Sequence, residues 1–300
     1  MKKLIFPILL AILLFSGCSE NKTVPVSNVI KAEIPKQNKD NEEDNSGIPA
    51  EIIENTKPSE ETAEKPKTET NEVSPKNEEQ ASAPEEQKAR FEEFNKCGFS
   101  GLLYIPENRT ENMPLVLYLH GGSFKGNDVS ILTEKDGLPQ YLANGQISPS
   151  AYILIPQLPQ SAKTWEEKTD SLLSLVSEIK TEYKIDGSRI SVTGHSMGGT
   201  GTWSLIISHS EIFSATAPLS GSVKFTPQNI AKLAEMPIFA VVGSADDIVP
   251  PESSEKFIDA LSKRNPKAEI KVVDGAGHFD IPKAAYIDEN IITWLISQTK

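Results

Sequence analysis

Hydrophobic residues form two kinds of pattern in the last two thirds of the 300-residue chain. Short continuous apolar runs, bounded by Gly, Pro and polar residues, are typical of strands. Between them lie segments whose apolar positions recur every three or four residues, as on one face of a helix. We predict strands at 99–105, 115–119, 151–155, 189–193, 215–219, 238–242 and 270–273, and helices at 168–183, 198–208, 252–262 and 284–297.

Most of the predicted strands are nearly continuous apolar runs, and they alternate with helices along the chain. Continuous apolar strands are buried on both faces, which is typical of a mostly parallel sheet with helices on each side. The sequence therefore predicts an α/β domain without an internal repeat. The segment 123–150 has no clear periodicity, and a long irregular segment of this kind is often a binding loop or a lid.

The amino-acid composition of the segment that precedes this domain differs from that of the domain. Residues 19–89 contain no Phe, Trp or Tyr, and they carry 17 acidic and 9 basic side chains together with regularly recurring prolines. Such a segment cannot build a core, so we predict a disordered acidic linker with a span on the order of 45 Å. Its expected role is to hold the domain away from a membrane or through a wall layer. The alternative is an interaction tail with a partner of its own. Residues 90–300 have the size of one globular domain.

The first 18 residues resemble a bacterial lipoprotein signal. Two lysines precede an apolar run from Leu4 to Phe15, which is too short to cross a bilayer and indicates export. Leu14 to Cys18 resembles the lipobox, although Phe15 stands where Leu is usual. The resemblance implies that Cys18 is lipidated and anchors the exported protein to the cell membrane, with residues 90–300 outside the cytoplasm. A simple secretory peptide in which Cys18 is incidental is the alternative.

Charge and cysteine content narrow the class of protein further. The net charge is −12, and residues 90–300 contain no basic cluster, which argues against a nucleic-acid partner. If Cys18 carries lipid, Cys97 has no partner for a disulfide. We therefore expect Cys97 to be a small buried hydrophobic residue near the first strand of the domain, and not a catalytic group.

The segment Gly194-His195-Ser196-Met197-Gly198 lies between a predicted strand and a predicted helix. A G-x-S-x-G motif alone is weak, because short motifs of common residues arise by chance. In this context it predicts a sharp turn that lifts a serine hydroxyl above the sheet edge, with glycines removing the Cβ clashes of that turn. A tight turn with a capping serine is the alternative.

A serine nucleophile requires a histidine base that is oriented by an acid. His195 is inside the motif and is expected to point elsewhere, which leaves His278, on a loop after the last predicted strand, as the candidate base. Asp246 and Asp247 follow another strand end, and both are candidates for the acid. Catalytic groups of parallel sheets gather beyond the carboxyl ends of the strands, where all three segments lie.

Four ordered blocks resemble the α/β-hydrolase superfamily over residues 99–299: 119–122, 194–199, 243–250 and 277–278. Within it the chain is similar to the exported esterase and predicted-peptidase group related to dienelactone hydrolases, acyl-protein thioesterases and polyhydroxyalkanoate depolymerases. In that family the acid stands three residues before the Val of D-x-x-V-P. The resemblance thus implies Asp246, and not Asp247, as the acid of a triad with Ser196 and His278.

The oxyanion of such a reaction needs backbone N–H donors. We expect one from Met197 at a helix start, and one from the loop after Leu119, with Gly122 favoured and Gly121 and Ser123 as alternatives. His120 is expected to order that loop by a hydrogen bond, because no second ligand stands at a spacing that would make it a metal site. Trp165 and Trp203 are candidates either for the core or for the pocket wall.

The sequence therefore predicts a serine hydrolase that cleaves carboxylic esters, small or oligomeric, through an acyl-enzyme on Ser196, without cofactor or metal. A prolyl-oligopeptidase-type peptidase and an acyltransferase use the same triad and are the enzymatic alternatives. A surface binding protein that keeps the fold without the chemistry is the alternative from another class. Neither acyl specificity nor oligomeric state follows from the sequence.

Overall fold

The computed structural model describes residues 88–300. The predicted signal at 1–18, with Cys18, and nearly all of the predicted linker at 19–89 lie outside the described residues. Within 88–300, none of the helices combines the length and the hydrophobicity needed to cross a bilayer.

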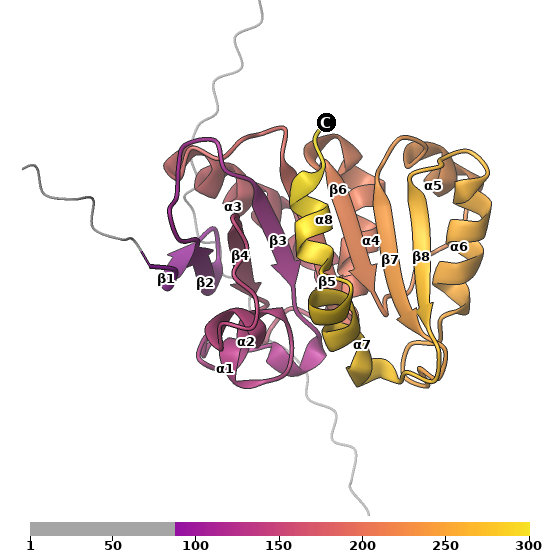
Figure 1. Ribbon diagram of the computed structural model, residues 1–300, viewed down its shortest axis with the longest axis horizontal. Coiled ribbons are helices and arrows are strands. Elements are labelled where there is room, and N and C mark those ends of the chain that lie inside the picture. Colours follow the sequence, from indigo (N-terminus) through magenta and orange to yellow (C-terminus); the bar gives the residue numbers. More distant parts are fainter. Residues whose placement is uncertain (1–87) are drawn as a thin grey trace, which may run out of the picture. The chain divides into compact units, whose positions relative to one another are not determined.

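An eight-stranded sheet forms the centre of the domain, with the strand order β1-β2-β4-β3-β5-β6-β7-β8 (Figure 1). Strands β3 to β8 run parallel to one another. Strand β2 is antiparallel to β4, and β1 is antiparallel to β2. This confirms the predicted α/β class. The strands are β1 Arg90–Lys96, β2 Phe99–Ile105, β3 Leu115–Leu119, β4 Tyr152–Gln157, β5 Ile190–His195, β6 Ala215–Leu219, β7 Ile238–Gly243 and β8 Ala268–Val273.

Helices cover both faces of the sheet, and the sheet separates two hydrophobic cores. One core lies under α3, α4 and α6, and the other lies under α1, α2, α7 and α8. The helices are α1 Ile131–Glu134, α2 Leu138–Ala143, α3 Thr169–Glu182, α4 Met197–His209, α5 Pro227–Lys232, α6 Glu252–Ser262, α7 Ile281–Lys283 and α8 Ile291–Ser297.

Strand β3 shows why the apolar runs are continuous. Leu115, Leu117 and Leu119 enter one core, and Val116 and Tyr118 enter the other, so all five consecutive side chains are buried. Successive side chains of a strand point to opposite faces, and a strand with helices on both sides therefore needs apolar residues at every position.

Strand β1 was absent from the sequence prediction. It forms a hairpin with β2 through the two-residue turn Cys97-Gly98, where φ is 51° and 78°. Positive φ at both central residues is what a two-residue type I′ hairpin requires, and Cys is not one of the residues that normally signal it. Cys97 is a free cysteine at this turn and is only partly buried, so the expectation that it is buried is wrong.

The closing helix predicted at 284–297 is interrupted, which corrects a second expectation. A π-helical turn covers Ala284–Asp288, and Asn290 adopts the left-handed conformation with φ 49° before α8 begins. Asn tolerates this conformation better than most residues. The break lets Tyr286 and Leu295 both reach the same core from separate segments.

The segment 123–150 is more ordered than its lack of periodicity indicated. It contains α1 and α2, and Leu132, Leu138 and Tyr141 are buried in the core beneath them. The helices are too short for a periodic pattern to be recognised. The two helices therefore pack onto the sheet, and only a few residues of the segment face the site described next.

Candidate active site

Ser196 lies at the turn between β5 and α4, as the motif predicts. Its backbone angles are φ 61° and ψ −121°, and its N–H donates to the carbonyl of Leu219 on the neighbouring strand at 3.0 Å. A positive φ in a residue with a side chain marks a strained turn. The half-buried Ser196 is held there by the strand before it and the helix after it.

The glycines around Ser196 are required by the approach of β3. A Cβ atom on Gly198 would lie 1.8 Å from the carbonyl oxygen of Leu119, and one on Gly194 would lie 2.5 Å from the same atom. Contacts this short are not tolerated, so only glycine allows the turn and β3 to come together. The turn is thereby set against the loop that follows β3.

Gly198→Ala is expected to prevent folding or to lower the free energy of unfolding by more than about 4 kcal/mol, because a backbone oxygen cannot move away from the new methyl group. Chemical denaturation measures the loss. Gly187→Ala is the matched control, since its Cβ would meet only the Lys180 side chain at 3.7 Å. Equal stability of the two variants would contradict the steric account.

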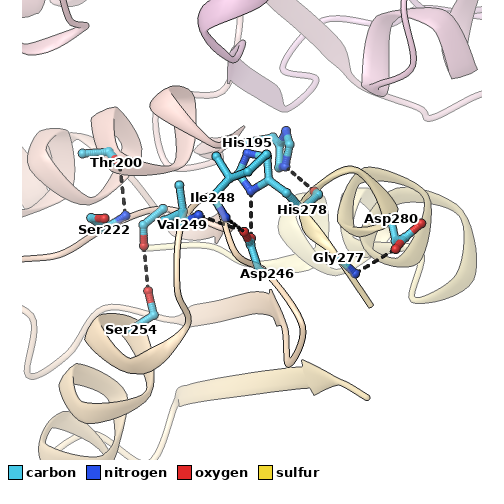
Figure 2. Close-up of polar contacts among 11 residues, drawn as sticks. His195, Thr200, Ser222, Asp246, Ile248, Val249, Ser254, Gly277, His278 and Asp280 are labelled. Atoms are coloured by element: carbon cyan, nitrogen blue, oxygen red, sulfur yellow. Dashed lines mark hydrogen bonds and ion pairs between the residues drawn. The ribbon is translucent and has the colours of Figure 1, made fainter. Parts of the chain in front are cut away.

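Asp246 and His278 form a buried pair (Figure 2). The Nδ1 atom of His278 lies 2.7 Å from Oδ2 of Asp246, and the side chains are 3% and 0% exposed. The other carboxylate oxygen, Oδ1, accepts the N–H groups of Ile248 and Val249 at 3.1 and 2.8 Å. Asp247 is exposed and makes no such contact with His278.

Electrostatics keep this carboxylate charged. Burial alone raises the pKa of Asp246, but the hydrogen bonds from the Val249 N–H and from His278 outweigh burial and hold the pKa below its ordinary value. An ionised Asp246 accepts the Nδ1–H of His278, which leaves Nε2 as the nitrogen that is free to take a proton.

His195 supports the same loop from the strand side. Its Nε2–H donates to the backbone carbonyl of His278 at 2.9 Å, and the two rings lie 4.6 Å apart (Figure 2). Burial, and to a lesser extent the neighbouring His278, lowers the pKa of His195 to about 4, so it is neutral at pH 7. The expectation that His195 points elsewhere is wrong, because its ring packs against that of His278.

The loop after β3 passes beside the nucleophile. A Cβ atom on Gly121 would lie 3.4 Å from Cβ of Ser196 and 4.0 Å from its Oγ. This contact places Gly121 and Gly122 next to Ser196, on the opposite side of β5 from the Asp246 and His278 loops. Met197, the first residue of α4, supplies an N–H that has no partner within the helix.

Three buried side chains and one exposed lysine fix this loop. Nε2 of His120 accepts the Leu158 N–H at 2.9 Å, its Nδ1–H donates to the Gly121 carbonyl at 2.7 Å, and Trp165 Nε1 donates to the His120 carbonyl at 3.0 Å. Gln157 Nε2 donates to the carbonyls of Phe124 and Asp128, and Lys135 Nζ donates to that of Ser123. Sequence reasoning anticipated His120 in this role and missed Gln157 and Lys135.

The buried His120 predicts sensitivity to acid. Burial lowers its pKa to about 4, below the ordinary value of 6.5, so between these pH values the unfolded chain binds a proton that the folded chain does not. The free energy of unfolding is expected to fall by about 3 kcal/mol from this group as the pH drops from 7 to 4. Denaturant titrations at several pH values should show a smaller fall in the free energy of unfolding for His120→Gln, whose amide oxygen can also accept the Leu158 N–H. An unchanged slope would contradict this.

A cavity of about 420 Å³ opens above these residues. Ser196 and His278 line it together with His195 of β5 and with residues that follow β3, β7 and β8: Gly121, Gly122, Ser123, Phe124, Lys135, Asp136, Ile248, Phe279 and Pro282. Trp165 and Trp203 are both 1% exposed, and neither lines this cavity, so both belong to the core. No three His, Cys, Asp or Glu side chains within 88–300 gather as a metal site would require.

Comparisons with known proteins agree with the α/β fold. Residues 150–290 match the dienelactone hydrolase family. Residues 88–300 have the α/β-hydrolase fold. Two solved structures share the fold: a thermostable esterase (TM-score 0.57, 22% identity, 71% of this chain and 64% of that one) and a feruloyl esterase module from Clostridium thermocellum complexed with sinapinate (TM-score 0.53, 16% identity, 69% and 87%).

A curated relative of the α/β-hydrolase domain is a bifunctional acetylxylan esterase/xylanase from Neocallimastix patriciarum. The two chains are 28% identical over 160 residues, which is 52% of this chain and 22% of the relative. The match thus spans about a fifth of the relative's length.

Proposed function

We propose that the α/β-hydrolase domain is a carboxylic ester hydrolase that works through an acyl-enzyme on Ser196. The observation that carries the proposal is the buried Asp246–His278 pair, whose histidine lines the same cavity as a serine held in a strained turn. The names of the relative and of the solved structures with the same fold support the ester as the bond that is cleaved.

In this reaction Ser196 Oγ attacks the ester carbonyl carbon while its proton passes to Nε2 of His278. The carbonyl oxygen becomes negative and is stabilised by the N–H groups of Met197 and Gly122. The bond between carbon and the alcohol oxygen then breaks, and His278 gives its proton to the leaving oxygen. Water, deprotonated by His278, cleaves the acyl-enzyme and restores Ser196, with Asp246 stabilising the imidazolium in both steps.

Substrates that share the acetyl group distinguish ester cleavage from the peptidase and acyltransferase reactions that the same triad can catalyse. The chain should hydrolyse p-nitrophenyl acetate with much higher kcat/KM than p-nitroacetanilide, and added methanol should not divert the acetyl group from water. Comparable rates on the anilide would favour a peptidase, and preferential formation of methyl acetate would favour an acyltransferase. Either result would overturn the proposal.

His195→Phe is expected to lower kcat about tenfold, because it removes the hydrogen bond to the His278 carbonyl while it keeps a flat ring. His195→Gln retains a side-chain N–H that can donate to the same carbonyl, and it should recover most of the loss. The kcat and KM of both variants on p-nitrophenyl acetate check this. Equal activity in the two variants would contradict a positioning role for His195.

We further propose that Cys18 is lipidated and that residues 19–89 tether the domain to the membrane. The apolar run before Cys18 and the absence of aromatic residues from the tether support this. Cell fractionation should find the chain in the membrane fraction, labelled by a palmitate analogue, and Cys18→Ser should release it. Retention of Cys18→Ser in membranes without label would overturn the lipid anchor.

A further inference from the structure

Two exposed apolar side chains stand at the mouth of the Ser196 cavity. Within residues 88–300, four large hydrophobic side chains are exposed: Phe225, Ile248, Val272 and Phe279. Of these, Ile248 and Phe279 both line the cavity, and they are 55% and 72% exposed. Apolar surface left open to water beside a concave site is typical of a surface that a ligand covers.

The strand order places this pair on one side of the nucleophile. Strand β3 lies on one side of β5, and β6, β7 and β8 follow on the other. The expected oxyanion donor Gly122 comes from the β3 side, whereas Ile248 follows β7 and Phe279 follows β8. Ile248 also holds Asp246 Oδ1 through its N–H, and the Phe279 ring lies 5.3 Å from the His278 ring.

Ester chemistry assigns a part of the substrate to each side. The carbonyl oxygen turns toward the oxyanion donors, and the alcohol oxygen must lie close to His278 Nε2, because it receives its proton there. Whatever carbon group is attached to the alcohol oxygen therefore extends from His278 toward Ile248 and Phe279.

We propose that Ile248 and Phe279 form an apolar clamp for the alcohol part of the substrate, so that the enzyme selects esters of apolar, and above all aromatic, alcohols. The inference rests on the proposed function and names the substrate class of that same site. A flat ring in the leaving group covers the exposed face of Phe279, while a methyl group leaves it in contact with water.

Three esters separate the two sides of the site: methyl acetate, phenyl acetate and methyl phenylacetate. Phenyl acetate carries its ring on the alcohol, and methyl phenylacetate carries it on the acyl group. Because each variant is compared with the wild type on the same ester, the intrinsic reactivity of the ester cancels. Phe225→Ala is the matched control, since Phe225 is 54% exposed and does not line this cavity.

Phe279→Ala in the full chain is expected to lower kcat/KM for phenyl acetate about tenfold, and to change it less than about twofold for the other two esters. Phe225→Ala should change none of the three by more than that factor. An equal loss on all three esters, a loss confined to methyl phenylacetate, or no loss would each overturn the clamp. A wild-type chain that hydrolyses none of them would instead overturn the proposed function, and the clamp with it.

Discussion

Replacing Ser196 with Ala is expected to lower kcat for p-nitrophenyl acetate by at least about 10⁴-fold, because the acyl group then has no oxygen to bond to. The remaining rate comes from the oxyanion donors and from substrate binding. The change removes one oxygen from a half-buried side chain that makes no side-chain hydrogen bond as an N-cap, so the fold should persist. Initial rates, together with a thermal unfolding curve, measure both effects.

Ser208→Ala is the control for this prediction. Ser208 is an exposed serine of the same helix, α4, and its hydroxyl donates only to the Ser204 carbonyl. It should leave kcat within about twofold of the wild type. A Ser196→Ala variant that turned over esters at a rate similar to that of the control would rule out the acyl-enzyme.

Asp246→Asn is expected to lower kcat by about 10⁴-fold without abolishing binding, since an amide cannot stabilise the imidazolium and can hold His278 in the wrong tautomer. The geometry makes the expectation specific, because Asp246 is buried against Nδ1 of His278 at 2.7 Å. A loss in kcat with a nearly unchanged KM is the signature to measure.

The neighbouring residue supplies a matched comparison. Asp247 has the same side chain and is exposed, and the hydrogen bond of His278 goes to Asp246 and not to Asp247. Asp247→Asn should stay within about twofold of the wild type. If Asp247→Asn lost more activity than Asp246→Asn, the acid would be misassigned.

The sequence was sufficient to predict the central parallel sheet, because its inner strands are buried on both faces and most of them leave a nearly continuous apolar signal. Strand β3 illustrates this, since its alternate residues fill two different cores. The Ser196 turn was equally visible, because β3 approaches so closely that glycine is required at 194 and 198. Steric requirements of this kind allow only glycine at a position, and they can therefore be recognised in a single amino-acid sequence.

Other features depend on contacts between distant segments, which a local pattern does not record. Strand β1 has an edge pattern and an unusual hairpin turn, Cys97-Gly98. His195 and Gln157 act through hydrogen bonds to backbone carbonyls of distant loops, at His278, Phe124 and Asp128. A carbonyl acceptor leaves no trace in residue identity, so the partners of these two side chains appear only in the folded chain.

Labelling with a fluorophosphonate, followed by mass spectrometry of the digested chain, tests the central claim most directly, because the probe bonds covalently to an activated serine. One adduct is expected, on the peptide that contains Ser196, with loss of esterase activity in proportion to labelling. The adduct should be absent from Ser196→Ala and formed much more slowly in Asp246→Asn. An active wild-type chain that carries the label on another residue, or that stays unlabelled, would contradict catalysis by Ser196.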